Sequence, residues 1–334
     1  MKKLRWGVIG AGGIAERRTI PGMLLANNAE LVAVMEITME KAEACRAKWG
    51  CKKAYDSEAA LLADPEIDAV YIASPVVLHA QQAMAAADAG KHILIEKPLA
   101  LTAEEGDKVI AYCAEKGVQI AAGFMMRFGT HVQAMKKAIA DGKMGKVVSG
   151  YAQFSGLSAP NEAAWRHYKA KSGGGTLMDM GVHCIDLMQY ITGSKVKQVA
   201  GFHDNLSFDY EVEDSSTVML RLENGCQCVV QSNFNIPYPI SKWRVSFWGE
   251  KGRLLGDEII GQIDGGTLDA CFCDEGEQNT EAEFGNMYTR EIESFGNSIL
   301  NNLPLEVPAS DAVQVQKVIE AAYRSNDEGI VITL

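Results

Sequence analysis

The sequence predicts an α/β protein with two domains, the first built on a parallel sheet and the second on a large, mostly antiparallel one. Three observations predict this architecture. Short apolar runs alternate with helical patterns up to residue 122, and alternating apolar and polar segments follow between residues 196 and 263. The length of 334 residues also suits two domains, because domains commonly have roughly 150 residues.

The first domain is predicted to span residues 1–122. Apolar runs predict its strands at Leu4–Ile9, Leu31–Met35, Ala69–Ala73, His92–Ile95 and Val118–Ala122. Helical patterns lie between them at Met39–Trp49, Val77–Ala89 and Thr102–Lys116. Thr102 and Glu105 have the spacing of a capping box, which begins a helix. Strands that alternate with helices imply right-handed βαβ units and therefore a parallel sheet.

The second domain is predicted to span residues 123–334. Period-two patterns separated by turn residues predict strands at Ser216–Leu222, Gln227–Asn233 and Trp243–Trp248. Helices are expected near His131–Asp141, Met178–Ile191 and Asp311–Ser325. We therefore expect an α+β domain whose open-faced, mostly antiparallel sheet has helices on one side.

Charge and composition exclude several classes of protein. Lys and Arg number 32 and Asp and Glu 43, so the net charge of −11 disfavours nucleic-acid binding. The longest uncharged stretch, Ala69–Ala87, contains Ser, Pro, His and Gln and does not resemble a membrane span. No signal-peptide pattern follows Met1, so we expect a cytoplasmic location. The 8 cysteines are expected to be free thiols, and their spacing predicts no metal site.

A glycine-rich turn follows the first predicted strand. Gly10, Gly12, Gly13 and Ile14 belong to a G-x-G-x-x-A pattern that closes at Ala15. Such a turn lets a pyrophosphate approach the backbone and the N-terminus of the next helix. Glu36 ends the second strand, where a carboxylate can bind the adenosine ribose hydroxyls. The sequence therefore predicts dinucleotide binding, and Glu36 favours NAD(H) over NADP(H), although NADP(H) is possible.

Two further patterns carry chemistry. Glu96-Lys97-Pro98 follows the strand His92–Ile95, at the carboxyl edge where ligands bind in open α/β sheets. Lys97 could donate to a substrate hydroxyl there, or could simply form a surface ion pair with Glu96. Asp179 and His183 have i, i+4 spacing on a predicted helix, which suits a general base and its orienting carboxylate. The alternatives are a local helix pair or a fragment of a zinc site. We read the preceding Gly173-Gly174-Gly175 as a loop that passes close to a ligand.

These motifs together resemble the Gfo/Idh/MocA family, the glucose–fructose oxidoreductase and inositol dehydrogenase group. The matching segments are Gly10–Ala15, Tyr71–Pro75, Ala89–His92, Glu96–Thr102, Trp165-Arg166 and Gly173–Asp186. The resemblance implies an N-terminal Rossmann domain and a catalytic set of Lys97, Asp179 and His183. It also implies a cis peptide before Pro98. It further places near the cofactor Ser74, Pro75, Glu96, Trp165, Arg166 and Tyr288.

One position departs from the family pattern, and one stays open. Val76 stands where many relatives have Asn after the Ser-Pro pair, which leaves the nicotinamide-side contacts less defined. His79 follows one helical turn later and could contact the edge of the cofactor or pack within its helix.

The resemblance implies an oxidoreductase that transfers a hydride between the nicotinamide and a secondary alcohol or ketone of a sugar, sugar derivative or cyclitol. Two alternatives share the fold: a glycoside-cleaving enzyme that uses tightly bound NAD for transient oxidation, and a noncatalytic NAD-binding sensor. The open face of the second sheet and the resemblance together imply a homodimer or homotetramer. The expected partners are therefore a small-molecule sugar or polyol and further copies of the chain.

Overall fold

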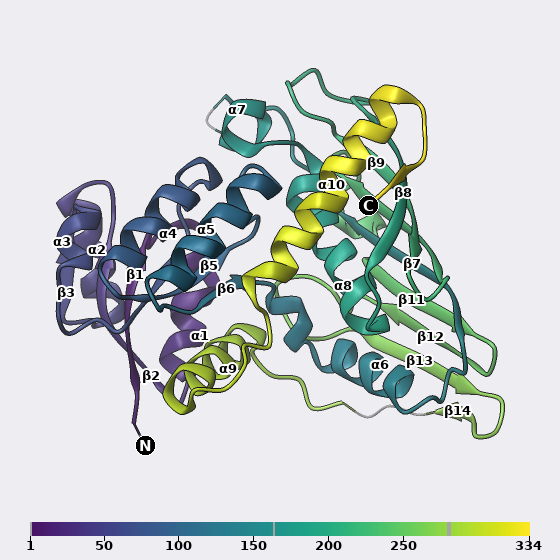
Figure 1. Cartoon of the computed structure of the whole chain (residues 1–334), viewed down its shortest axis with the longest axis horizontal. Coiled ribbons are helices and arrows are strands. Elements are labelled where there is room, and N and C mark those ends of the chain that lie inside the picture. Colours follow the sequence, from purple (N-terminus) through teal and green to yellow (C-terminus); the bar gives the residue numbers. More distant parts are fainter. Residues whose placement is uncertain (1, 163, 279–281) are drawn as a thin grey trace. The chain divides into compact units, whose positions relative to one another are not determined.

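A computed structural model describes residues 2–162, 164–278 and 282–334. The chain forms two compact units, one of Met1–Met125 with Asn286–Val313 and the other of Met126–Gly285 with Gln314–Leu334 (Figure 1). The predicted boundary after residue 122 lies close to the observed one after Met125. Residues 286–313, which the sequence assigned to the second domain, belong instead to the first unit.

The first unit contains the predicted parallel sheet. Its strand order is β3-β2-β1-β4-β5-β6, and every pair of neighbours is parallel. This order reverses direction between β1 and β4, as in Rossmann folds. The expected Rossmann domain is therefore confirmed. The strands are β1 (Leu4–Ile9), β2 (Ala29–Met35), β3 (Lys53–Tyr55), β4 (Ala69–Ile72), β5 (His92–Glu96) and β6 (Ile120–Gly123).

Helices cover both faces of this sheet. Thr102 caps α5 as predicted, because its hydroxyl accepts from Glu105 N at 3.1 Å. The Glu105 carboxylate reaches back to Leu101 N at 3.0 Å rather than to Thr102 N. The helices of this unit are α1 (Ile20–Leu25), α2 (Met39–Trp49), α3 (Glu58–Leu62), α4 (His79–Asp88), α5 (Ala103–Glu115) and α9 (Met287–Asn301).

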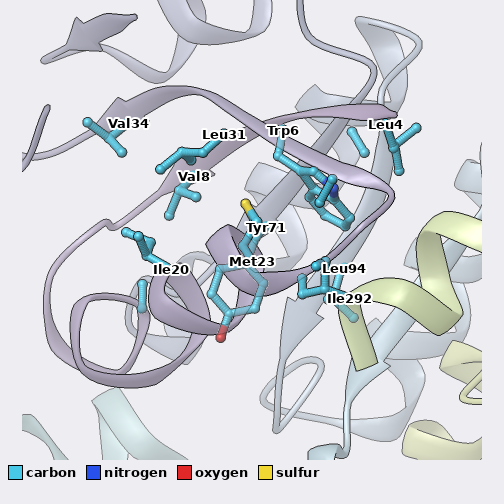
Figure 2. Packing of buried hydrophobic residues seen from close by; sticks show 14 of the residues in the cluster. Leu4, Trp6, Val8, Ile20, Met23, Leu31, Val34, Tyr71, Leu94 and Ile292 are labelled. Atoms are coloured by element: carbon cyan, nitrogen blue, oxygen red, sulfur yellow. The ribbon is translucent and has the colours of Figure 1, made fainter. Parts of the chain in front are cut away.

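The apolar side of α9 explains why residues 286–313 join the first unit. Ile292 and Phe295 are buried in one cluster with Trp6, Tyr71 and Leu94 from the parallel sheet. Figure 2 shows Ile292 of α9 among the labelled residues of this cluster. The rings of Trp6 and Phe295 lie 5.2 Å apart. Burial of these large side chains outweighs the distance in sequence, and the sequence pattern gives no sign of such a long-range choice.

The second unit contains a sheet of nine described strands in the order β14-β13-β12-β11-β7-β10-β9-β8-β15. The pair β7–β10 is parallel and all other neighbours are antiparallel, which confirms the mostly antiparallel prediction. The strands are β7 (Val147–Ser155), β8 (Val196–Asp204), β9 (Ser215–Leu222), β10 (Gln227–Asn233), β11 (Arg244–Gly249), β12 (Gly252–Asp257), β13 (Thr267–Phe272), β14 (Gly276–Gln278) and β15 (Ile332–Thr333).

One face of this sheet packs on helices and the other stays open. On β9, Val218, Leu220 and Leu222 are buried, whereas Met219 and Arg221 between them are exposed. The helices of this unit are α6 (Thr130–Ala140), α7 (Lys169–Ser172), α8 (Val182–Thr192) and the later part of α10 (Ala309–Glu328). No helix in the described part of the chain is both long and apolar enough to cross a membrane.

Candidate active site

The carboxyl ends of β1, β2, β4 and β5 bring the predicted site residues of the first unit to one edge of the sheet. Ile9 of β1 pairs with Met35 of β2 and with Ile72 of β4, and Ile72 pairs with Ile95 of β5. The residues that follow these partners therefore lie in a row across the sheet, with neighbouring strands about 4.8 Å apart. The row contains the glycine turn, Glu36, the Ser74 segment and Lys97.

The glycine turn has the backbone that a phosphate group requires. Gly10 has a φ of +77°, and a Cβ on it would lie 2.9 Å from Ser74 N, so only glycine allows the turn to approach the end of β4. Gly13 has a φ of +56°, and a Cβ on it would meet nothing within 4 Å, which leaves space beside the backbone. The first helical bond runs from Glu16 N to Gly12 O, so the N–H groups of residues 13–15 precede it. This turn fits a dinucleotide pyrophosphate.

Glu36 lies directly against this turn. Its Oε1 accepts from Gly12 N at 2.6 Å and its Oε2 from Ile37 N at 3.1 Å. A Cβ on Gly12 would lie 2.9 Å from Glu36 Oε1, so a larger residue at position 12 would displace the carboxylate. Ile37 is 74% exposed and brings no positive charge to this corner. A carboxylate at this place can accept hydrogen bonds from the hydroxyls of a ribose diol.

His79 joins two loops at the same edge of the sheet. It is 1% exposed, and its ring nitrogens lie 2.9 Å from Pro98 O and 2.9 Å from Ser74 O. Burial lowers the pKa of this imidazole, and the contacts with the two carbonyl oxygens oppose that shift. These contacts correspond to the packing interpretation of His79, and they hold the Ser74-Pro75 segment against the loop after Lys97. The Lys97–Pro98 peptide is cis, as the resemblance implies.

Glu96 turns into the unit rather than toward solvent. Tyr71 Oη donates to Glu96 Oε1 and in turn accepts from Thr19 Oγ1 at 2.9 Å. Glu96 Oε2 accepts from the backbone N of Lys97 at 3.2 Å. This chain of hydrogen bonds fixes the end of β5 and hence the backbone that carries Lys97. Burial and the nearby Glu96 carboxylate raise the pKa of Tyr71, which remains a hydroxyl donor.

Two polar side chains of α9, Tyr288 and Glu291, lie close to Glu96, and the sequence singled out only the first. Tyr288 is 2% and Glu291 3% exposed, and Tyr288 Oη and Glu291 Oε1 make no hydrogen bond with any described residue. Burial first, and the Glu96 charge second, raise the pKa of both groups. Tyr288 follows from the resemblance, but Glu291 was missed, because nothing in its local sequence indicates burial.

In the second unit, Asp179 and His183 stand at the junction of two helical segments. Leu177–Gly181 is a π-helix that contains Asp179, and His183 lies in the first turn of α8. The sequence predicted one regular helix here, whereas π-helical turns often mark functional sites. His183 is 4% exposed, and its ring meets Phe154 at 6.3 Å between centroids.

The structure brings Asp179 together with a residue that the resemblance assigned to the cofactor. Arg166 Nε lies 3.3 Å from Asp179 Oδ1, and the Arg166 guanidinium stacks 4.4 Å from the Trp165 ring centroid. Arg166 and Asp179 therefore form one charged group, and the Trp165 ring supports it.

The glycine loop before this helix has a different neighbour from the one we expected. A Cβ on Gly174 would lie 2.1 Å from Tyr323 Oη, and one on Gly175 would lie 2.0 Å from Glu213 O. These glycines are needed because protein groups approach them, and the interpretation as a loop that passes close to a ligand stays a prediction. Glu213 and Tyr323 are thus two residues that sequence reasoning missed.

The described residues also bear on metal binding. All 8 cysteines are free, and the described part of the chain has no group of three or more His, Cys, Asp or Glu side chains arranged to hold an ion. Cys226 precedes β10 and Cys228 lies in it, with their sulfurs 3.7 Å apart.

The glycine turn, Glu36 and the β-strand edge define a dinucleotide-binding protein, and comparisons with known proteins identify its family. Residues 4–124 match the oxidoreductase family with an NAD-binding Rossmann fold, and residues 132–255 match the GFO/IDH/MocA C-terminal domain. The chain belongs to the Gfo/Idh/MocA family and is an oxidoreductase.

Three relatives illustrate the range of this family. D-xylose 1-dehydrogenase (NADP(+)) 2 of Haloferax volcanii is 30% identical over 99% of this chain and 100% of its own. Myo-inositol 2-dehydrogenase of Thermotoga maritima is 26% identical over 97% of both chains. The crystal structure of aldose-aldose oxidoreductase from Caulobacter crescentus, complexed with glycerol, is 26% identical, covers 100% of both chains and has a TM-score of 0.92.

Proposed function

We propose that this protein is an NAD(H)-dependent dehydrogenase or reductase of a secondary alcohol or ketone in a sugar, sugar derivative or cyclitol. The observation that carries the proposal is that three side chains suited to proton transfer, those of Lys97, Asp179 and His183, occur in a member of this oxidoreductase family. Lys97 follows β5 at the dinucleotide edge, and Asp179 and His183 lie on one helical segment of the second unit. Similar proteins are named for xylose and myo-inositol.

The proposed roles follow from the chemistry of the three side chains. Bound NAD would supply the hydride acceptor for the carbinol carbon. His183 accepts the hydroxyl proton as general base, and the Lys97 ammonium stabilises the developing alkoxide. Asp179, paired with Arg166, orients the reacting group or His183. The residues proposed to line the cofactor are Ser74, Pro75, Glu96, Trp165, Arg166 and Tyr288.

The test is an oxidation assay. The purified protein is incubated with NAD and a panel of polyols, aldoses and cyclitols, and NADH absorbance is followed. We expect NADH to form with at least one member of the panel. Sugar release from glycosides without net NADH would instead indicate the glycoside-cleaving alternative. NAD binding with neither reaction, across alcohols and ketones in both directions, would contradict the proposal and favour a sensor.

We further propose that NAD(H) is preferred to NADP(H). Glu36 places a carboxylate at the ribose corner, where it repels a 2′-phosphate, and the exposed Ile37 adds no cation. Glu36→Ser with Ile37→Arg should shift the ratio of affinities toward NADP by about tenfold or more. Ile37→Arg alone is the matched control, since it keeps the repelling carboxylate. Equal affinities of the unmodified protein for the two cofactors, measured by calorimetry, would contradict this preference.

The open face of the second sheet is proposed to bind a second copy of the chain. The strand register aligns mostly apolar side chains across this face. The row runs through Ala200, Met219, Val229, Tyr151, Ser246 and Leu255. An apolar row on an open sheet is typical of an interface. A homodimer or homotetramer is therefore expected in sedimentation, and a monomer at micromolar concentration would contradict it.

A further inference from the structure

Glu213 holds the start of the helical segment that carries Asp179 and His183. It is 8% exposed, and it lies just before β9 in sequence. Its Oε2 accepts from Gly175 N at 2.9 Å and its Oε1 from Leu177 N at 3.0 Å. Its backbone carbonyl accepts from Thr176 N at 3.1 Å. One residue thus binds three successive N–H groups that a helix start would otherwise leave without acceptors.

Tyr323 of α10 completes this arrangement. Its hydroxyl donates to Glu213 Oε1 at 2.9 Å. Gly174 and Gly175 permit the contact, because a side chain at either position would overlap Tyr323 or Glu213. Three donors therefore converge on one carboxylate, which has enough lone pairs to accept from all of them. The charge also lies at the positive end of the helix dipole.

The position of Gly175 sets the orientation of the residues that follow it. The first bond of the helical segment runs from Asp179 N to Gly175 O at 3.1 Å, and His183 comes one turn later. A second contact holds the middle of α8, where Asp186 forms a buried ion pair with Arg127 at 2.5 Å. The segment is therefore fixed before and after His183 by buried charged groups that the proposed mechanism does not use.

We propose that Glu213, supported by Tyr323, is a positioning residue that sets the orientation of Asp179 and His183 for proton transfer. This inference rests on the proposed function, because it assigns Glu213 a part in the same reaction. Glu213 itself touches neither substrate nor cofactor in this proposal; it acts through the helix start.

The first variant is Glu213→Gln, which keeps the size of the side chain. An amide has one oxygen, so either orientation leaves one of the N–H groups of Gly175 and Leu177 facing the amide NH₂. The helix start must shift to relieve this contact. Because small displacements of catalytic groups cost up to about 100-fold in rate, we expect kcat to fall by about 10- to 100-fold. The dissociation constant for NAD should not change.

Asp264→Asn is the matched control. Asp264 is also buried, and it also accepts from three donors. Two of them are at the start of α6, Thr130 N at 2.9 Å and Thr130 Oγ1 at 2.6 Å, and the third is Gly285 N at 3.0 Å. The helix that it caps, α6, carries none of the proposed catalytic residues. Both variants are assayed where thermal unfolding shows them folded. If Glu213→Gln loses no more activity than Asp264→Asn, the positioning role is wrong.

A double variant separates positioning from general stability. If Glu213 acts on proton transfer through His183, Glu213→Gln should cause less than about a threefold further loss of activity in a His183→Ala background, since the general base that it orients is absent. A further loss as large as in the unmodified protein would overturn the proposal.

Nuclear magnetic resonance tests the inference without any substrate. The ring resonances of His183, assigned by their loss in His183→Ala, should move in Glu213→Gln and stay in place in Asp264→Asn. An unmoved His183 signal in Glu213→Gln overturns the positioning role even if the enzyme oxidises sugars. Conversely, a moved signal supports the structural link, while failure of the oxidation assay with unmodified protein would count against the proposed function alone.

Tyr323→Phe covers the case in which Glu213→Gln does not fold. It removes one donor and leaves both backbone hydrogen bonds to Glu213. We expect a smaller displacement of the His183 resonances and a loss in kcat of a few fold. Unchanged resonances and unchanged kcat in Tyr323→Phe would overturn the role of the pair.

Discussion

The two units bury a glutamate in different ways. Glu213 of the second unit accepts three hydrogen bonds through its carboxylate, two from a helix start and one from Tyr323. Glu291 of the first unit is buried as deeply, but its Oε1 makes no hydrogen bond with a described residue. Desolvation raises the pKa of both. A carboxylate with several donors stabilises the structure, whereas a buried carboxyl oxygen without a donor carries an uncompensated desolvation cost.

That cost lies beside residues proposed to bind the cofactor. Tyr288, on the same helix as Glu291, also has a buried hydroxyl without a hydrogen bond among the described residues. Buried polar groups without partners are rare and call for an explanation such as function. The first unit therefore contains, near the end of β5, buried polar atoms without hydrogen bonds to any described residue. The second unit instead uses buried charged groups to hold the helical segment that leads into α8.

Among the proposed variants, His183→Ala should have the largest effect on turnover, and it tests whether the second unit supplies the general base. Loss of a general base lowers turnover by roughly 10²- to 10⁴-fold, which is about 3–5 kcal/mol of transition-state stabilisation. NAD affinity should hardly change, because the imidazole would contact the substrate rather than the phosphate or the adenosine. The measurement is single-turnover hydride transfer at saturating NAD and substrate. Transfer at the unmodified rate would show that His183 is structural.

Lys97→Ala is the companion variant in the first unit. It should also impair hydride transfer, because the alkoxide would lose its stabilising cation. The double variant with His183→Ala should lose less than the two single losses combined, since both groups act on one alkoxide. Fully independent losses in the double variant would argue against a shared site of action.

Glycine substitutions should show that the backbone is packed more tightly at Gly175 in the second unit than at Gly13 in the first unit. Gly175→Ala places a Cβ 2.0 Å from Glu213 O, so backbone must move, and we expect a loss of about 3 kcal/mol or more in unfolding free energy. Gly13→Ala has open space and costs only the left-handed backbone strain of about 1–2 kcal/mol. Urea unfolding of both variants compares them. Equal losses would contradict the difference in packing.

Local patterns were sufficient for many elements. The sequence predicts β1 at Leu4–Ile9, α2 at Met39–Trp49 and β10 at Gln227–Asn233 with the bounds that the structure shows. Each has its own signal, either a bounded apolar run, a helical pattern with glycine after it, or a strict alternation. The glycine turn and Glu36 were found for the same reason, because the motif is contiguous and its partner follows the next strand.

Long-range choices could not be predicted in this way. Ile292 packs in the core of the first unit although it follows the whole second sheet in sequence. Glu213 binds Gly175 and Leu177 from 38 and 36 residues away. The adjacent Gly174 and Gly175 did signal a close approach, but a glycine does not reveal which group approaches it. The resemblance supplied Tyr288 and the cis peptide, which no periodicity indicates.

The last test concerns the protonation of Glu291 and uses the pH dependence of stability. Its pKa in the folded protein is raised well above the ordinary value of 4.5, so the folded state binds this proton more tightly than the unfolded state does. The stability that comes from this proton is fully present below about pH 4.5 and is lost as pH rises through the folded pKa. Glu291→Gln cannot lose a proton and keeps the volume of the side chain. The unfolding free energy of Glu291→Gln should therefore increase relative to that of the unmodified protein as pH rises, by up to about 1.4 kcal/mol per pH unit within this window.

Urea unfolding of both proteins at intervals from about pH 4.5 to 8 measures this difference in unfolding free energy. Parallel curves for the two proteins would mean that Glu291 ionises normally, and the contrast with Glu213 would then be one of hydrogen bonding alone.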